Sequence, residues 1–375
     1  MNWRMSIHRV VSRDDFHTLI LSLEGAGYTV IGPTVAQDAI VYDRIHQVED
    51  LPLGWTDEQG PGVYRLDRRG DDALFGYAVG QRSWKGYLYP PKSTLFTVSR
   101  DGDSWQFVPA EVPEVRYAIL GVRACELTAI AIQDRVFLGS EHPDRIYDTV
   151  RRDLFTIGVN CGVAGGTCFC VSMESGPRCE SGYDLVLTEI VEQGRHEFVF
   201  QAGSEAGEAI LEQLPGRSAT PDDLDTVDEI VAHTASSMGR SMDTTEIREL
   251  LLSNLEHPRW DDVADRCLAC TNCTLVCPTC FCSTVEDSVT LDGQEATRTR
   301  RWDSCFSLDF TGLHGVPVRQ STRARYRQWM THKLATWYDQ FGSSGCVGCG
   351  RCITWCPVGI DITEEVAAIR ATQEV

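Results

Sequence analysis

Two stretches of this 375-residue chain repeat one pattern of cysteines, C-x2-C-x2-C-x3-C-P. They are CLACTNCTLVCP at 267–278 and CVGCGRCITWCP at 346–357. The short gaps let three successive thiolates converge on three corners of one iron–sulfur cube, and the fourth cysteine points towards a neighbouring cluster. The proline that follows ends the loop and fixes the direction of the chain. The repeat therefore predicts two [4Fe-4S] clusters.

Because each fourth cysteine points away, the spacing predicts that the two motifs exchange it. The first cluster would be held by set 1, which is Cys267, Cys270, Cys273 and Cys356. The second would be held by set 2, which is Cys346, Cys349, Cys352 and Cys277. The alternative is a pair of zinc sites. Zinc ribbons use two C-x2-C knuckles, whereas each motif here supplies three close thiolates and one for its partner, which favours iron–sulfur.

A third group of cysteines lies between residues 125 and 170, in GVRACEL and VNCGVAGGTCFC. We define set 3 as Cys125, Cys161, Cys168 and Cys170. Cys161 follows an apolar run typical of a strand, and the glycines after it would let the backbone turn tightly around a bulky ligand. Set 3 is therefore a candidate third [4Fe-4S] site. The alternative is buried free cysteine, which packs as a small apolar side chain, and Cys179 could replace one ligand.

Three further cysteines have no assigned partner: Cys280, Cys282 and Cys305. With Asp303 or His314 they could form a zinc site or an unusual cluster. They could also line the pocket of a neighbouring cluster. The residues alone leave these alternatives open.

The composition agrees with metal-binding cysteines. The chain has 16 cysteines and a net charge of -20. Its N-terminal stretch lacks the apolar core of a secretory signal, and no run approaches the roughly 18 apolar residues of a membrane span, so we expect a cytoplasmic protein. In that reducing compartment metal binding is a better explanation of the cysteines than disulfides. The acidic charge argues against nucleic-acid or anionic-membrane partners.

The remaining pattern predicts an α+β protein of two domains. Residues 1–222 carry short apolar, β-branched runs separated by turns, such as those at 93–100, 117–122 and 155–161, which predict a mixed α/β domain. Residues 223–375 are expected to form a mostly helical domain of the α-helical ferredoxin type.

Two features of the second domain can be checked directly. One helix is expected to open with Asp243 as its N-cap, and the clearest helix is expected at 325–341. A basic stretch between residues 298 and 333 has eight Lys or Arg against two Asp. It could dock an acidic partner and favour reduced clusters, or it could pair internally with carboxylates.

The sequence shows no recognisable motif for a substrate, nucleotide or nickel–iron site. It shows no G-x-G-x-x-G fingerprint, no phosphate-binding loop of the G-x-x-x-x-G-K-[ST] type, and no pair of C-x2-C motifs for a nickel–iron centre. We therefore assign no catalytic residue. The chain is expected to conduct electrons between partners.

Several stretches together resemble one known family. They are GVRACELTAIAIQDRVFLG, VNCGVAGGTCFCVSM, CLACTNCTLVCPTCFCSTVED, RRWDSCFSLDF and HKLATWYDQFGSSGCVGCGRCITWCPVGIDI. Between about residues 90 and 365 the chain is similar to the β subunit of group 3b cytosolic [NiFe] hydrogenases, the NADP-linked sulfhydrogenase type. The electron-transfer subunit of anaerobic sulfite reductase is a relative in the same family.

The resemblance implies a non-catalytic electron-transfer subunit of an oxidoreductase complex. Its neighbours would be a subunit that binds flavin and NAD(P), and the small and large subunits that carry the nickel–iron centre. It also implies cluster roles for sets 1 and 2 and supports set 3. The alternatives are the same role in an anaerobic sulfite reductase, a cluster-based redox sensor, and a structural zinc protein.

Overall fold

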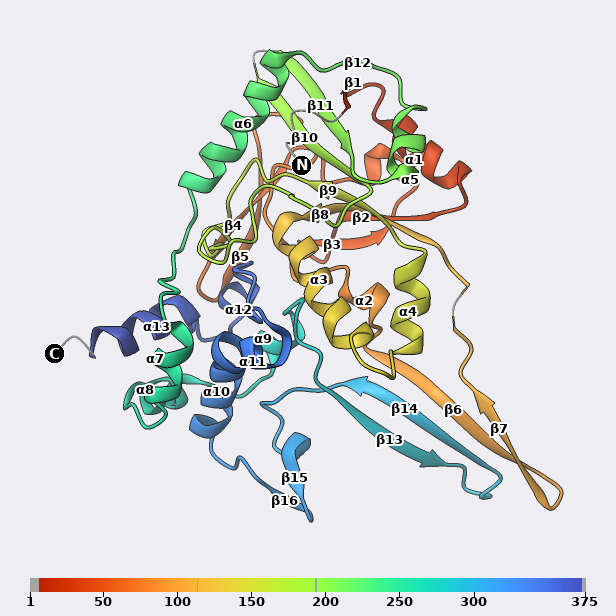
Figure 1. Cartoon of the computed structure of the whole chain (residues 1–375), viewed down its shortest axis with the longest axis vertical. Coiled ribbons are helices and arrows are strands. Elements are labelled where there is room, and N and C mark those ends of the chain that lie inside the picture. The colour runs from red at the N-terminus through yellow and green to blue at the C-terminus, as the bar shows by residue number, and fades with distance from the viewer. Residues whose placement is uncertain (1–6, 113, 193, 373–375) are drawn as a thin grey trace.

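The computed structural model describes residues 7–112, 114–192 and 194–372, so the first six residues of the N-terminal stretch lie outside the described residues. Its largest element is an eight-stranded mixed sheet in the upper part of Figure 1. From edge to edge the strands are β12 (Arg217–Ser218), β1 (His8–Ser12), β11 (Arg195–Ala202), β10 (Leu185–Glu192), β9 (Phe155–Val159), β8 (Tyr117–Arg123), β2 (Thr29–Ala36) and β3 (Ala39–Arg44). The neighbours β10, β9, β8 and β2 run parallel.

Helices cover both faces of this sheet. One face packs against α1 (His17–Gly25) and α5 (Glu205–Leu211). The other packs against α3 (Ala124–Leu138), α4 (Arg145–Arg152) and α6 (Pro221–Ser236). Parallel strands covered on both sides need apolar residues in both orientations. The apolar runs at 117–122 and 155–161 meet this need, and they form β8 and β9 as predicted.

Shorter elements of the first half join the sheet to the rest of the molecule. The hairpin of β4 (Trp55–Gly60) and β5 (Val63–Arg68) reaches towards the second half of the chain, as does α2 (Lys85–Leu88). The short 3-10 helix at Val48–Asp50 follows β3. Several side chains of the candidate site come from these connecting segments.

Helices of the second half surround the cysteine motifs. They are α7 (Ile247–Ser253), α8 (Arg259–Arg266), α10 (Thr322–Thr331) and α13 (Ile362–Ala371). Their buried side chains, among them Trp260, Tyr326 and Val366, form one apolar core on which cysteines of sets 1 and 2 pack.

The two helix predictions had different outcomes. The helix at 325–341 is confirmed: α10 continues through a π-helical turn at His332–Thr336 into α11 (Trp337–Phe341). The N-cap prediction for Asp243 is wrong, because α7 begins only at Ile247. Asp243 instead accepts a hydrogen bond from the Thr245 backbone N–H at 2.9 Å, a local turn that competes with helix.

A second sheet, which we call the arm, projects from the body of the molecule (Figure 1). It is antiparallel, in the order β13 (Ser283–Val289), β14 (Glu295–Trp302), β6 (Lys92–Asp101) and β7 (Ser104–Pro109). β6 contains the predicted strand at 93–100. The arm therefore combines strands from both sides of the expected boundary at residue 222.

The segment between the cysteine motifs is thus less helical than expected. Besides β13 and β14 it forms the small hairpin β15 (Gly312–Leu313) and β16 (Val316–Pro317). The coarser expectation of a mixed α/β protein is confirmed. Among the described residues, no helix has the length and apolar character needed to cross a membrane.

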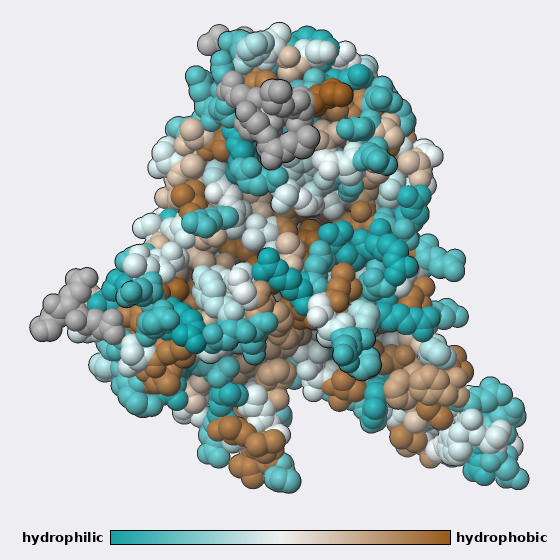
Figure 2. Space-filling view, in the orientation of Figure 1, coloured by the Kyte–Doolittle hydropathy of each residue, from teal (hydrophilic) through white to brown (hydrophobic). Residues whose placement is uncertain are grey.

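One face of the arm is apolar and open to solvent. The strand register places Val98 opposite both Phe107 and Ala296, and Ala296 opposite Val289, so these side chains share a face. Phe107 is 60% exposed and Val289 is 65% exposed. Figure 2 shows apolar side chains along this projection and at the β15–β16 hairpin. Exposed apolar patches of this kind mark interaction sites.

Candidate metal centres

The two cysteine motifs share one local backbone. Ala269 and Thr271 in the first have φ of 48° and 71°, and Gly348 and Gly350 at the equivalent places of the second have φ of 62° and 75°. A short helix follows in each, α9 (Asn272–Leu275) and α12 (Arg351–Thr354). The two motifs therefore share their backbone conformation as well as their cysteine spacing.

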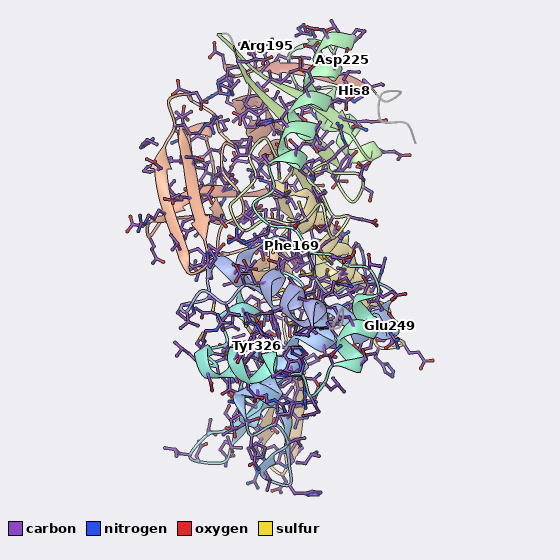
Figure 3. All side chains as sticks on the ribbon, turned by 90° about the vertical axis from the view of Figure 1, so that its left-hand side faces the viewer. His8, Phe169, Arg195, Asp225, Glu249 and Tyr326 are labelled. Atoms are coloured by element: carbon purple, nitrogen blue, oxygen red, sulfur yellow. The ribbon has the colours of Figure 1, made fainter. Side chains whose placement is uncertain are left out.

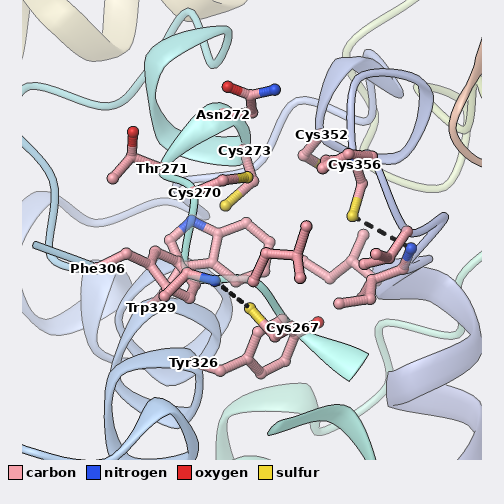
Figure 4. Close-up of a pocket in the computed structure, with 16 residues that line it drawn as sticks. Cys267, Cys270, Thr271, Asn272, Cys273, Phe306, Tyr326, Trp329, Cys352 and Cys356 are labelled. Atoms are coloured by element: carbon pink, nitrogen blue, oxygen red, sulfur yellow. Dashed lines mark hydrogen bonds between the residues drawn. The ribbon is translucent and has the colours of Figure 1, made fainter. Parts of the chain in front are cut away.

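The four thiols of set 1 line one pocket, shown in Figure 4. Phe306, Tyr326 and Trp329 form its apolar wall. Burial, and then the neighbouring thiols of set 1, raise the pKa of Cys273 well above its usual value. The structure thus brings the distant Cys356 to the three cysteines of the first motif.

The polar groups around this pocket suit a bound sulfide-containing group. Tyr326 OH and Trp329 Nε1 are buried and have no hydrogen-bond acceptor among the described residues. A buried donor without an acceptor costs about 1–3 kcal/mol, and the sulfides of a cluster would accept such bonds. Backbone N–H groups already donate to Cys267 Sγ at 3.4 Å and to Cys356 Sγ at 3.3 Å. Set 1 therefore fits an iron–sulfur cluster.

Set 2 is assembled across the long segment between the motifs. Burial, and then Cys346, Cys349 and Cys277, raise the pKa of Cys352 well above its usual value, so these cysteines lie near one another. The Gly348 N–H donates to Cys346 Sγ at 3.5 Å. Cys277 of the first motif is therefore close to the three cysteines of the second.

A buried lysine contacts set 2 directly. Lys333, in the π-helical turn, donates from Nζ to Cys277 Sγ at 3.2 Å, to Thr279 Oγ1 at 3.1 Å and to Gly345 O at 2.9 Å. Burial acts to lower its pKa, but the nearby cysteines, Cys277 first, raise it well above the usual value. The Cys280 thiol and the Lys333 ammonium lower the pKa of Cys277.

A second buried lysine lies on the backbone of the same segment. Lys85 donates from Nζ to the carbonyls of Cys277 and Cys280, both at 3.1 Å, and lies 3.9 Å from the centre of the Trp302 ring. Lys85 and Lys333 are each 3% exposed. Burial lowers the pKa of Lys85, and Cys280 and Cys277 act to raise it. An ammonium group so deeply buried requires negative charge nearby. A cluster with thiolate ligands would supply it.

Set 3 lies at the carboxyl edge of the large sheet. Cys125 is in the first turn of α3 directly after β8, and Cys161 comes just after β9. Because neighbouring parallel strands end at the same edge, the two are brought together. Burial, and then Cys161 and Cys168, raise the pKa of Cys170. Cys179 is buried nearby, and its backbone N–H donates to Asn160 Oδ1 at 2.8 Å.

The three sets follow one another, with set 2 in the middle. Cys273 of set 1 helps to raise the pKa of Cys352 in set 2. On the other side, Cys349 of set 2 helps to raise the pKa of Cys125 in set 3. Set 3 is therefore next to set 2, and set 2 is next to set 1.

The loops of sets 2 and 3 are in direct contact. The Phe169 N–H donates to Gly348 O at 2.8 Å, and Figure 3 shows Phe169 at mid-height of the molecule, above Tyr326. A Cβ at Gly348 would lie 2.6 Å from the Phe169 carbonyl oxygen, and a Cβ at Gly350 would lie 2.4 Å from that of Thr167. Glycine is therefore required at both places by the close approach as well as by φ.

Gly350→Ala is expected to destabilise the protein by about 1–3 kcal/mol, because the methyl group would push the Thr167 backbone away. The urea midpoint of the anaerobically purified chain would measure this loss. The matched control is Thr271→Gly at the equivalent place of the first motif, where a side chain is already accommodated at positive φ. Equal losses in the two variants would contradict the role of the loop contact.

A buried ion pair ties the second motif to the large sheet. Arg351 Nη2 lies 2.5 Å from Glu126 Oε1, and Arg351 Nε donates to Gly80 O at 2.7 Å. Glu126 also accepts from Tyr42 OH at 3.0 Å and from the Arg123 N–H at 3.1 Å. The two arginines are both buried, and they lie beside Cys349 and Cys161 respectively.

The three unassigned cysteines lie near set 2 at the foot of the arm. Their suggested fourth ligands are otherwise engaged or exposed: Asp303 Oδ1 accepts from the Ser304 N–H and from Ser307 Oγ, both at 2.7 Å, and His314 is exposed in the β15–β16 turn. Among the described residues, no group of three or more His, Cys, Asp or Glu side chains is placed to hold a single metal ion, so the structure does not support a zinc site at these three cysteines.

The basic stretch is largely paired inside the chain. Ion pairs join Arg298 to Asp287, Arg300 to Asp144, Arg301 to Glu286, Arg323 to Glu256 and Asp261, and Arg327 to Glu256. Arg325 donates to two backbone carbonyls. Internal pairing thus accounts for most of these charges, and Lys333 is the member that contacts a candidate cluster ligand.

Sequence reasoning missed two contributors to the site. Lys85 has no local signal, since it precedes the cysteines it contacts by almost 200 residues. Glu126 stands beside Cys125 in GVRACEL, but nothing in the sequence pairs it with Arg351. Such contacts depend on the packing of distant segments.

Comparison with known proteins agrees with this site. Residues 266–360 match the family model described as "4Fe-4S dicluster domain". The chain is 29% identical over 356 residues to sulfhydrogenase 2 subunit beta of Pyrococcus furiosus, covering 91% of this chain and 92% of the relative. The predicted resemblance to a hydrogenase β-type subunit is thereby confirmed.

Among solved structures, a serine palmitoyltransferase from S. paucimobilis aligns at 11% identity and a TM-score of 0.18, covering 59% of this chain and 57% of that one. A likeness this weak carries no argument about this protein.

Proposed function

From the similarity to a sulfhydrogenase β subunit over nine-tenths of the chain, we propose that this protein relays electrons within a cytoplasmic [NiFe] hydrogenase complex. It would stand between a subunit that binds flavin and NAD(P) on one side and the small and large catalytic subunits on the other. Sets 1, 2 and 3 would each hold a [4Fe-4S] cluster. An iron–sulfur electron-transfer subunit is the part of this proposal that the dicluster match supports.

The observation that carries the proposal is the series of three thiol sets. Each set combines three cysteines of one short stretch with one from a distant part of the chain, and set 2 adjoins both others. A storage or structural role does not need three neighbouring sites in series, whereas electron transfer through the protein does. When bound, a [4Fe-4S] cluster accepts and releases single electrons.

Residues around the three cysteine sets contribute to these sites in three ways. Backbone N–H groups and the Lys333 ammonium donate to the thiols, which tunes their basicity. Buried aromatic residues exclude water: Trp329 and Trp337 are almost fully covered, and Trp355 stacks on Tyr64 with ring centres 4.9 Å apart. The ion pair of Arg351 and Glu126 holds the second motif against the sheet.

The number of clusters is tested by iron analysis. The anaerobically purified chain is expected to contain about twelve iron and twelve sulfide per molecule, and Cys125→Ser should remove about four of each. Cys179→Ser is measured beside it, because Cys179 is the alternative ligand: its iron content should stay unchanged if set 3 is correct, and a loss of about four iron atoms would assign Cys179 to the site. About eight iron atoms in the native chain would reject set 3, and zinc in place of iron would reject the proposed function.

The apolar face of the arm supports the proposal that this protein contacts partner subunits. We expect the double variant Trp105→Ser and Phe107→Ser to reduce co-purification with the partner subunits at least tenfold, because it removes two large exposed side chains from that face. Gln106→Ser, on the opposite face of the same strand, is the matched control. Iron content should stay unchanged in both variants. Equal co-purification of all three proteins would exclude the arm as a subunit contact.

A further inference from the structure

The three cysteines outside the sets share one place in the fold, the foot of the arm. β13 begins immediately after Cys282, and β14 ends shortly before Cys305. The Asp303 N–H donates to the Cys282 carbonyl at 2.9 Å, which continues the strand pairing by one residue. This pairing of the two arm strands is what brings Cys305 to Cys282.

Cys282 and Cys305 lie close together where the two arm strands meet. Both line one cleft, and each is the first influence on the pKa of the other thiol. Two neighbouring cysteines on adjacent paired segments are placed for bonding to each other.

The pair is also accessible. Cys282 and Cys305 are partly exposed and line an open cleft with Phe281, Arg319, His332 and Phe341. The pKa of Cys282 is lowered, first by Cys305 and also by the Lys333 ammonium, whereas Cys282 and burial raise the pKa of Cys305. An accessible thiolate next to a cation is the usual setting of a reactive cysteine.

We propose that Cys282 and Cys305 form a redox-active dithiol–disulfide couple that exchanges with a thiol- or disulfide-bearing molecule entering this cleft. Set 2 is adjacent, since Lys85 donates to the carbonyls of both Cys277 and Cys280, and Cys280 is two residues from Cys282. The couple would therefore connect two-electron sulfur chemistry with a one-electron carrier.

The exchange balances without any further reactant. One thiolate of the pair attacks a sulfur of the incoming disulfide, a mixed disulfide forms, and one thiol leaves. The second cysteine then attacks the mixed disulfide, the Cys282–Cys305 bond forms, and the second thiol leaves. Two electrons and two protons have passed to the incoming molecule.

The pair is restored by the reverse transfer. Two single-electron transfers, which a cluster held by set 2 would supply, and two protons from solvent would reopen the Cys282–Cys305 bond. This return step rests on the proposed electron-transfer function, whereas the exchange step does not.

The test is a redox titration of the intact, anaerobically purified chain. It is equilibrated with reduced and oxidised dithiothreitol at a series of ratios, alkylated, and digested for mass spectrometry. We expect the peptides of Cys282 and Cys305 to lose their label together along a two-electron curve and to appear as one linked peptide. Cys282→Ser should abolish the linked peptide with no loss of iron, and Cys179→Ser should leave the curve unchanged.

Two results would overturn the proposal. One is labelling of both cysteines in the native chain at every ratio, which needs no variant to interpret. The other is a loss of about four iron atoms in Cys282→Ser or Cys305→Ser, which would make these residues cluster ligands. A chain that titrates as expected but contains no iron would keep the couple and reject the electron-transfer function, so the two failures are distinguishable.

Discussion

Replacing Lys333 by methionine is expected to lower the reduction potential of the centre held by set 2 by on the order of 100 mV. The Lys333 ammonium is buried and lies 3.2 Å from Cys277 Sγ, so it stabilises the extra negative charge of the reduced state. A unit charge about 5 Å away contributes roughly 3 kcal/mol at an effective dielectric constant near 20. For one electron, 59 mV corresponds to a tenfold change in equilibrium, about 1.4 kcal/mol.

The potential would be measured by a redox titration followed by electron paramagnetic resonance. The matched control is Arg298→Met, which removes an exposed cation already paired with Asp287 on the arm and should leave the potential unchanged. Lys85→Met should give a smaller shift, because Lys85 donates to backbone carbonyls and not to a ligand sulfur. An unchanged potential in Lys333→Met at full iron content would show that this lysine serves packing alone.

Glu126→Ala is expected to destabilise the protein by about 3–5 kcal/mol, because it leaves the buried Arg351 guanidinium without its carboxylate. The variant also removes the acceptor of Tyr42 OH and of the Arg123 N–H. Because Arg351 stands between two cysteines of set 2, we expect iron to be lost from this set first.

The urea midpoint and the iron content of the anaerobically purified variant would be measured together. Asp339→Ala is the control, since it removes a long-range but exposed ion pair with Arg248, whose loss should cost less than about 1 kcal/mol. Glu126→Gln separates charge from shape, because the amide keeps an acceptor for Tyr42. Equal midpoints for Glu126→Ala and Asp339→Ala would refute the structural role of the buried pair.

The proposed dithiol couple lies near Lys333, so this lysine links the couple to set 2. Lys333 contacts Cys277 and also acts on Cys282 and Cys305. A change at Lys333 should therefore alter both the potential of set 2 and the dithiothreitol midpoint of the pair. Changes at Glu126 lie on the far side of set 2, next to set 3, and should alter stability without moving that midpoint.

The sequence by itself determined the parts of this protein that depend on local spacing. Repeated C-x2-C-x2-C-x3-C-P motifs impose the same turns and the same short helix twice, so the local backbone around both sets of cysteines follows from the spacing alone. Apolar runs of β-branched residues likewise predicted β6, β8 and β9, because strand burial is written in the alternation and polarity of neighbouring residues.

Only the tertiary structure decided what lies around those motifs. The register of β6 with β14 joins residues about 200 apart into the arm, and the same folding brings Cys305 to Cys282. Lys85 reaches the carbonyl of Cys277, and Gly350 accepts the Thr167 backbone, through packing between segments that share no sequence signal. Such contacts are set by the shapes and buried charges of whole elements, which no local pattern encodes.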